Sequence, residues 1–220
     1  MNVSLSDEIK KMLPLKIGLI TYNNITIGET PQWIHGRIDL FQEELTLALE
    51  GKSVNAIQGV KEWREIFKII GTDPSRYRPS HEALLRRIIK GQKLPSIHSG
   101  ADMNNLFSMK YEIPMGIYDL MHINGPVTVR VGGESDTYEG INGREMNMSG
   151  KLLTSDHDGA FGSPIVDSKR TMVTETTTRA LQVLYLKPSL ADEQQLDIVK
   201  TVAEGFIKVN GGDADYQIID

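Results

Sequence analysis

The sequence predicts an α+β fold, a single domain whose β-sandwich-like core is flanked by helices. Amphipathic helical patterns gather in the first half of the chain, and short β-like segments separated by glycines fill the second half. This segregation argues against a doubly wound parallel sheet, in which strands and helices alternate. A chain of 220 residues can also bury a core without help from a disulfide or a metal ion.

Each element follows from a local pattern. Apolar residues recur at intervals of three and four in the predicted helices, and glycine follows each of them. These helices cover 38–49, 60–70, 81–90 and 190–208. Alternation and β-branched residues predict a strand or hairpin at 16–27 and strands at 126–131, 137–140, 151–155, 180–186 and 216–219. We therefore expect the sandwich to begin at about Gly100.

Composition and missing motifs exclude several classes of function. The chain has 40% hydrophobic and 24% charged residues, as ordinary globular proteins do, and it lacks cysteine. No apolar stretch is long enough for a membrane helix, and the charged segment 1–14 does not resemble a signal peptide. The sequence has no phosphate loop, dinucleotide fingerprint or zinc-protease motif. We expect a complete, cytoplasmic protein with no cofactor, no metal and no membrane partner.

Charge is distributed unevenly along the chain. The net charge is −5, but residues 1–100 carry +3 and residues 101–220 carry −8. Segment 76–93 contains several basic residues and a single acidic residue, Glu82. Arginine forks suit phosphate groups, so an RNA backbone contact is one interpretation, and a solvated helix face with its charges paired elsewhere is the other. The candidate RNA-binding residues are Arg76, Arg78, Arg86, Arg87 and Lys90.

Two further segments carry polar groups that could hold a ligand. Segment 96–119 contains the adjacent Asn104 and Asn105, whose amides can bind a carbonyl or a hydroxyl group. Its alternative reading is a helix with solvent-facing polar residues, followed by a turn. Segment 167–178 begins with Asp167 and is rich in threonine. Beyond Asp167 it contains a single acidic residue, Glu175. Its alternative reading is a plain threonine-rich strand.

In this order, the stretches RYRPSHEALLRR, ADMNNLFS, IPMGIYDL and DSKRTMVTETT resemble a known domain. They are similar to the editing domain of the phenylalanyl-tRNA synthetase β subunit, called B3/B4 or the tRNA-binding domain, and still more to free-standing proteins built from it. The resemblance is strongest over 75–186 and weak over 1–70, within one domain spanning 1–220. In the synthetase, this domain hydrolyses tyrosine wrongly attached to the phenylalanine tRNA.

The resemblance assigns roles to individual positions. Asn105 matches the family asparagine, Asn104 stands where the family has threonine, and Gly116 stands where the synthetase has its editing histidine. It implies Asn104, Asn105 and Glu175 as catalytic residues. It implies a substrate pocket formed by Gly116, Tyr118, Asp119, Asp167, Ser168, Arg170, Thr171 and Thr174. We expect Asn104, Asn105, Gly116 and the 174–175 segment to converge on one cavity.

Two functions remain open on these grounds. The first is binding of aminoacyl-tRNA, with hydrolysis of a mischarged amino acid in trans as an open question because the histidine is absent. The second is a non-catalytic module that holds a free amino acid or a similar metabolite. A complete phenylalanine–tRNA ligase is not expected, because the aminoacylation machinery is not recognisable in the sequence.

Overall fold

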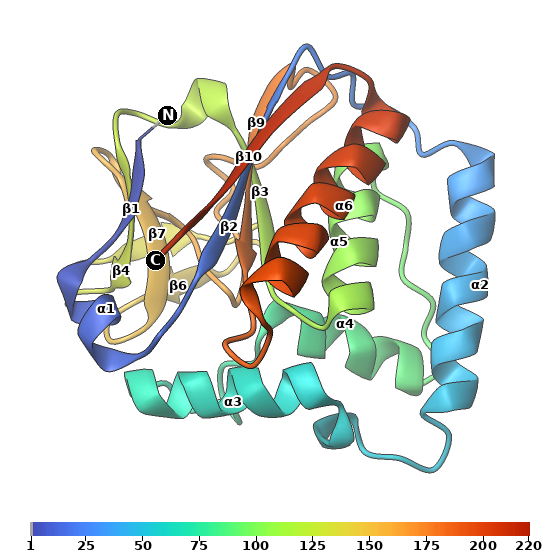
Figure 1. Ribbon diagram of the computed structural model, residues 1–220, viewed down its shortest axis with the longest axis horizontal. Coiled ribbons are helices and arrows are strands. Elements are labelled where there is room, and N and C mark those ends of the chain that lie inside the picture. Colours follow the sequence, from blue (N-terminus) through green and yellow to red (C-terminus); the bar gives the residue numbers. More distant parts are fainter. Residues whose placement is uncertain (1) are drawn as a thin grey trace.

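Two four-stranded sheets form the centre of the protein in a computed structural model that describes residues 2–220 (Figure 1). The first sheet has the order β1-β4-β7-β8, and the second has the order β10-β2-β9-β3. In the first sheet the strands are β1 (Val3–Leu5), β4 (Val127–Val131), β7 (Leu152–Asp156) and β8 (Gly159–Gly162). In the second they are β10 (Asp213–Ile219), β2 (Ile17–Asn23), β9 (Arg179–Tyr185) and β3 (Met115–Asp119). A small hairpin is formed by β5 (Thr137–Glu139) and β6 (Glu145–Asn147).

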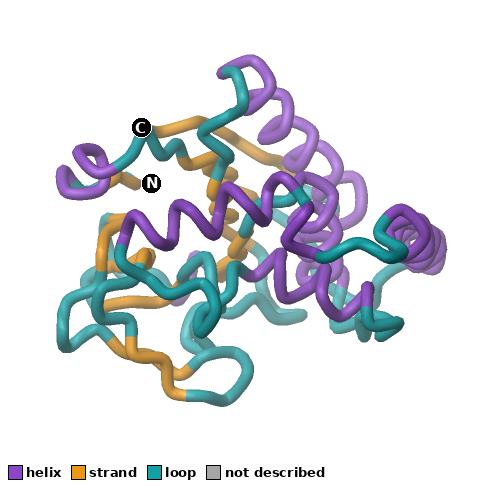
Figure 2. The backbone as a smooth tube through the Cα atoms, turned by 90° about the horizontal axis from the view of Figure 1, so that it is seen from below, coloured by secondary structure: helices purple, strands orange, loops and turns teal. Residues whose placement is uncertain are grey.

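Helices cover one face and one end of this sandwich. The α-helices of residues 2–220 are α1 (Asp7–Met12), α2 (Gln32–Ala48), α3 (Gln58–Ile70), α4 (Ser80–Ile89), α5 (Ser99–Tyr111) and α6 (Asp192–Asn210). Two short 3₁₀ turns are η1 (Val54–Ala56) and η2 (Leu120–His122). Helices α5 and α6 lie against the second sheet, α3 runs along one end of both sheets, and α2 stands at the edge of the molecule (Figures 1 and 2). Within residues 2–220, no helix is both long and apolar enough to cross a lipid bilayer.

The main core lies between the two sheets. Its side chains alternate inward along the strands, as in Leu19 of β2, Val129 of β4 and Val183 of β9, and Trp63 of α3 closes the end. A second apolar cluster lies between the second sheet and helices α5 and α6. A third apolar cluster joins α2 and α4 to α3 and α5, and its buried side chains include Leu85 and Ile88. The second sheet therefore separates two apolar cores. Each candidate site residue on this sheet points into one core or the other.

The predicted α+β fold and its sandwich are confirmed, with three corrections. The sandwich does not begin at Gly100, because β1 pairs in parallel with β4, and β2 lies between β10 and β9. The helix predicted for 38–49 begins at Gln32. The segment after α5 is the buried strand β3, reached through Glu112 in the left-handed conformation, and not a turn.

The threonine-rich segment is a loop, so the alternative reading as a strand is wrong. The Thr174 amide donates to the Thr177 hydroxyl at 3.0 Å, and the Thr176 amide donates to the Thr174 hydroxyl at 3.3 Å. Such local side-chain bonds compete with a β-ladder for the backbone donors. The segment consequently turns back on itself before β9 begins.

Candidate functional site

Asn104 is a buried structural residue on the α5 side of the second sheet. Its amide nitrogen donates to the Met115 carbonyl at 3.2 Å, and its amide oxygen accepts from Gln182 at 2.8 Å. Gln182 in turn accepts from the buried Tyr22 hydroxyl at 2.7 Å. Both ends of the Asn104 amide are therefore engaged in a network that fastens α5 to β2, β3 and β9.

Gly116 and Tyr118 lie on the opposite face of the same sheet, between the two sheets. The Tyr118 hydroxyl donates to Oδ1 of Asp167 at 2.6 Å. A Cβ atom at position 116 or at Gly162 would overlap the Tyr118 phenol. The tyrosine ring thus fills the space into which a histidine side chain at position 116 would project, and the two side chains exclude one another.

The surroundings of Asp167 form a polar cluster within the sandwich. Burial raises the pKa of Asp167 to about 7, although hydrogen bonds from Tyr118 and from the amides of Ser163 and Ile117 oppose this change. Burial also raises the pKa values of three neighbouring tyrosines, Tyr118, Tyr138 and Tyr185. The hydroxyl group of Tyr185 bonds Thr154 at 2.9 Å, and that of Tyr138 donates to the Val166 carbonyl at 2.6 Å. The hydroxyl group of each of these tyrosines therefore has a hydrogen-bond partner within the protein.

The 174–175 segment is anchored elsewhere. The Thr177 hydroxyl donates to Oδ2 of the buried Asp119 at 2.6 Å, while the Met121 amide donates to Oδ1 of the same carboxylate at 2.9 Å. Thr174 is half-buried and Glu175 is exposed. Asp119 therefore shapes this loop, and Glu175 projects into solvent.

The remaining predicted pocket residues hold the 156–171 region together. The Arg170 guanidinium binds both carboxylate oxygens of Asp156, at 3.0 and 2.9 Å, and donates to the His122 carbonyl. The buried Ser168 hydroxyl accepts from the Arg170 amide at 3.0 Å, and Thr171 donates to a carbonyl of β8 at 3.4 Å. The side chains of Ser168, Arg170 and Thr171 thus form hydrogen bonds to other groups of the protein.

The structure therefore does not bring Asn104, Asn105, Gly116 and the 174–175 segment into one cavity. Asn104 and Gly116 are separated by the second sheet, because successive side chains along β3 and its partners point to opposite faces. Of the three predicted catalytic residues, Asn105 is the one that faces an open hollow. The catalytic roles of these residues remain predictions.

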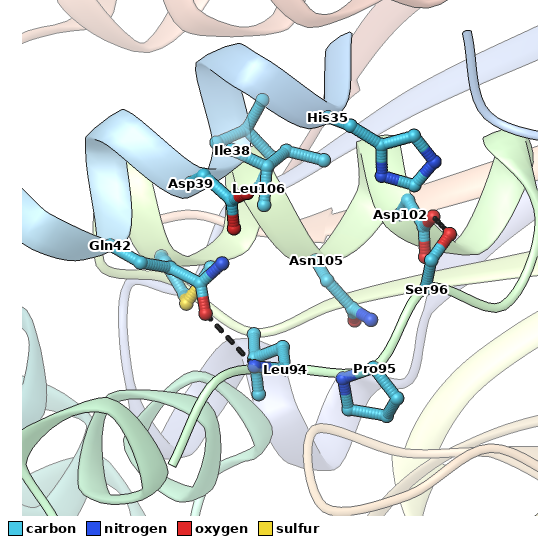
Figure 3. Close-up of a pocket in the computed structure, with 11 residues that line it drawn as sticks. His35, Ile38, Asp39, Gln42, Leu94, Pro95, Ser96, Asp102, Asn105 and Leu106 are labelled. Atoms are coloured by element: carbon cyan, nitrogen blue, oxygen red, sulfur yellow. Dashed lines mark hydrogen bonds between the residues drawn. The ribbon is translucent and has the colours of Figure 1, made fainter. Parts of the chain in front are cut away.

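The hollow beside Asn105 lies between α2, α5 and the segment that connects α4 to α5 (Figure 3). Its enclosed part measures about 40 Å³, and the whole concavity measures about 400 Å³ when its mouth, open to solvent, is counted. Its polar rim includes Asn105, His35 and Asp102, and apolar side chains such as Ile38 and Leu106 form its wall. The enclosed part has room for little more than water, so a ligand would use the polar and apolar groups at the open mouth of the hollow.

Asp102 gives the hollow its shape. Its carboxylate accepts from the Thr30 hydroxyl at 2.6 Å, the Ser96 hydroxyl at 2.5 Å and the Ile97 amide at 3.0 Å. On the other wall, the Gln42 side chain accepts from the Leu94 amide at 2.9 Å. These bonds fix the connecting segment against α2 and α5.

Sequence reasoning missed His35 and Asp102 as hollow residues. Asp102 lies within the polar segment 96–119, but one of its hydrogen-bond partners is Thr30, which is far away in sequence. His35 has no partner spacing that would distinguish it from the other histidines. No cluster of three or more His, Asp or Glu side chains suited to a metal ion occurs among residues 2–220.

The candidate RNA-binding residues fall into two groups. Arg86 donates to Glu82 at 2.7 Å and to Asn55 at 2.9 Å, and Glu82 is fully buried between Arg86 and Arg64. Arg86 is therefore paired within the protein. For this residue the alternative interpretation holds, a helix face whose charges are paired elsewhere in the fold. The remaining members, which form no ion pair within the described chain, are Arg76, Arg78, Arg87 and Lys90.

Comparison with known proteins identifies the family. The B3/4 domain family matches residues 62–198, which is more than half of the chain. The protein belongs to the B3/4 domain family. This confirms the resemblance drawn from the motifs. The uncharacterized protein YhzB of Bacillus subtilis (strain 168) is 27% identical over 213 residues, or 96% of each chain.

One solved structure is similar to this B3/4 domain protein over almost its whole length. It is an N-terminal fragment of the phenylalanyl-tRNA synthetase β subunit from Pyrococcus horikoshii, with 14% identity and a TM-score of 0.48. The alignment covers 97% of this chain and 50% of that fragment. The B3/4 domain protein thus spans half the length of the synthetase fragment it matches.

Proposed function

We propose that this B3/4 domain protein binds the 3′ end of an aminoacyl-tRNA. In this proposal the basic residues along α4 contact backbone phosphates, and the aminoacyl group lies across the open mouth of the hollow beside Asn105. The observation that carries the proposal is the direct connection between the two. Segment 91–96 leaves the basic end of α4, and its residues Leu94, Pro95 and Ser96 line the hollow.

The charges along this path favour a polyanion. Arg87 and Lys90 lie at the end of α4, and Arg76 and Arg78 lie before its beginning. A helix of ten residues is about 15 Å long at 1.5 Å per residue, so the two pairs can contact separate phosphates of one strand. Arginine donates two parallel hydrogen bonds to phosphate, which fits this role.

The first prediction concerns the salt dependence of RNA binding. We expect the double variant R78A/R87A to weaken binding of aminoacyl-tRNA and to reduce the slope of log affinity against log salt by about 0.7–0.9 for each lost contact. A fluorescence titration over a range of salt concentrations measures both quantities. The matched control is K200A/K208A, which removes the same charge from exposed positions on α6. Equal slopes for the two double variants would contradict phosphate contacts along α4.

A second candidate activity, hydrolysis of the aminoacyl ester, is favoured by His35. Its imidazole lies in the same hollow as Asn105, and imidazole is the usual general base near neutral pH. Asn105 supplies an amide that can orient the ester carbonyl. This arrangement differs from the one expected from the motifs, because Glu175 is exposed away from the buried Asn104.

The second prediction separates these residues by rate. With a panel of correctly charged and mischarged tRNAs, we expect H35Q to slow release of the amino acid by about 10²- to 10⁴-fold, as removal of a general base does. We expect E175Q to leave the rate unchanged, and N105A to lower it. If E175Q slows the release of the amino acid and H35Q does not, the general base is Glu175 and not His35. Absence of hydrolysis by the wild type would favour the module that holds a free amino acid, whose affinity is measured by calorimetry without tRNA.

A further inference from the structure

The outer face of α2 carries an exposed apolar stripe, in which the Trp33 ring stacks with Arg37 of the same helix at 5.6 Å. Trp33, Leu40 and Leu47 are 47%, 57% and 73% exposed. They are seven residues apart, so they lie almost in line, with two turns of helix between neighbours. The opposite face of α2, with Ile34 and Phe41, packs onto the protein. Figure 2 shows α2 nearly end-on, standing at the edge of the molecule.

Charged side chains within the stripe decide how it can pair. Arg37 lies between Trp33 and Leu40, and Glu44 lies between Leu40 and Leu47. A parallel pairing of two copies would set Arg37 against Arg37 and Glu44 against Glu44, which is repulsive. An antiparallel pairing about a two-fold axis at Leu40 instead sets Arg37 of one copy against Glu43 and Glu44 of the other. The stripe is therefore complementary to itself in one orientation only.

The same antiparallel register matches the apolar groups. Trp33 lies seven residues before Leu40 and Leu47 lies seven residues after it, so each indole faces a leucine of the other copy. Gly36 lies four residues before Leu40 and faces Glu44, and nothing in the fold lies within 4 Å of the place where its Cβ would be. This leaves room for the two helix backbones to approach.

We propose that the outer face of α2 is the interface of a two-fold symmetric dimer of this chain. Closed two-fold pairs are the commonest way in which a self-complementary surface is satisfied. The helix has 17 residues and is about 25 Å long, so the contact is at the small end of specific interfaces and depends on protein concentration. The hollow beside Asn105 lies on the inner side of α2 and stays open in the dimer.

The third prediction uses the absence of cysteine from the chain. In L40C the single thiol lies on the two-fold axis, and we expect mild oxidation to form a covalent dimer in high yield. In L47C the two thiols of an antiparallel pair are about 21 Å apart along the helix, and we expect no such product. Denaturing gel electrophoresis without reductant reads out both variants. Cross-linking of L47C as readily as L40C would overturn the antiparallel arrangement.

A charge-reversal series tests the same interface without a thiol. We expect sedimentation velocity to show dimers of the wild type at high concentration and monomers of R37E. The triple variant R37E/E43R/E44R restores opposite charges across the axis, and we expect it to dimerise again. L196D, at an exposed leucine of α6, is the matched control and should dimerise as the wild type does. A wild type that stays monomeric at all concentrations, with L40C uncross-linked, would overturn the proposal.

Discussion

Gly116→Ala is expected to lower the free energy of unfolding by about 2–3 kcal/mol, which is at the upper end of typical overpacking costs. The added methyl group would overlap the phenol of Tyr118. That ring cannot move aside, because Gly162 also lies against it and its hydroxyl is bonded to Asp167 at 2.6 Å. Urea denaturation followed by circular dichroism measures the change.

Two variants show whether the cause is this overlap. Gly28→Ala is the control, because nothing lies within 4 Å of the Cβ it would add, and we expect little change. In a Tyr118→Leu background the ring is gone, so Gly116→Ala should cost less there than in the wild type. If Gly116→Ala is as stable as Gly28→Ala, the sandwich has room at position 116. In that case Tyr118 would not exclude a histidine at this position.

The second large effect is a pH dependence of stability that Asp167 and His81 drive in opposite directions. Burial raises the pKa of Asp167 to about 7, so between pH 4 and 7 the folded state holds a proton that the unfolded state has released. The stability that Asp167 contributes is thus fully present below about pH 4 and is lost as the pH rises to about 7. The loss is about 1.4 kcal/mol for each pH unit within that interval.

His81 acts in the reverse sense. Burial lowers its pKa to about 3, and the nearby Lys187 acts in the same direction. The backbone of Gly59 opposes this lowering of the pKa, but neither ring nitrogen forms a well-aligned hydrogen bond. The unfolded state therefore binds a proton that the folded state does not, and stability is lost as the pH falls from about 6.5 toward about 3.

We therefore expect the wild type to show a flatter stability profile than either variant. The advantage of the wild type over D167N should shrink as the pH rises from about 4 to about 7. Its advantage over H81L should grow across nearly the same interval. Denaturant unfolding of the three proteins at several pH values provides the measurement. A D167N profile parallel to that of the wild type would show that Asp167 titrates normally.

Much of the local structure was predictable because its causes are local. Helices α3 and α4 follow from apolar residues at helical spacing, and each is followed by a glycine with positive φ, Gly71 at 93° and Gly91 at 72°. The strand at 126–131 follows from alternation, and β4 occupies Val127–Val131. The family resemblance was readable for a similar reason, since it depends on residue identities in order along the chain.

Long-range pairing set the limits of prediction. Nothing near Val3 or Ile17 indicates that β1 joins β4 or that β2 lies between β9 and β10. These contacts join segments more than one hundred residues apart, and in β-sheets the partner strand supplies half of every hydrogen bond. The sequence therefore predicted a sandwich but not that its first strands come from the N-terminus.

By itself, the sequence determined the fold class, the positions of most helices and strands, and membership of the B3/4 family. The tertiary structure alone decided which polar residues meet. Asn104 bonds the backbone at Met115, next to Gly116, yet Gly116 and Tyr118 face the other interior. Asn105 is next to Asn104 in sequence and faces the hollow formed with α2. Side-chain direction within an element is local, but which interior or hollow it meets depends on elements packed from elsewhere in the chain.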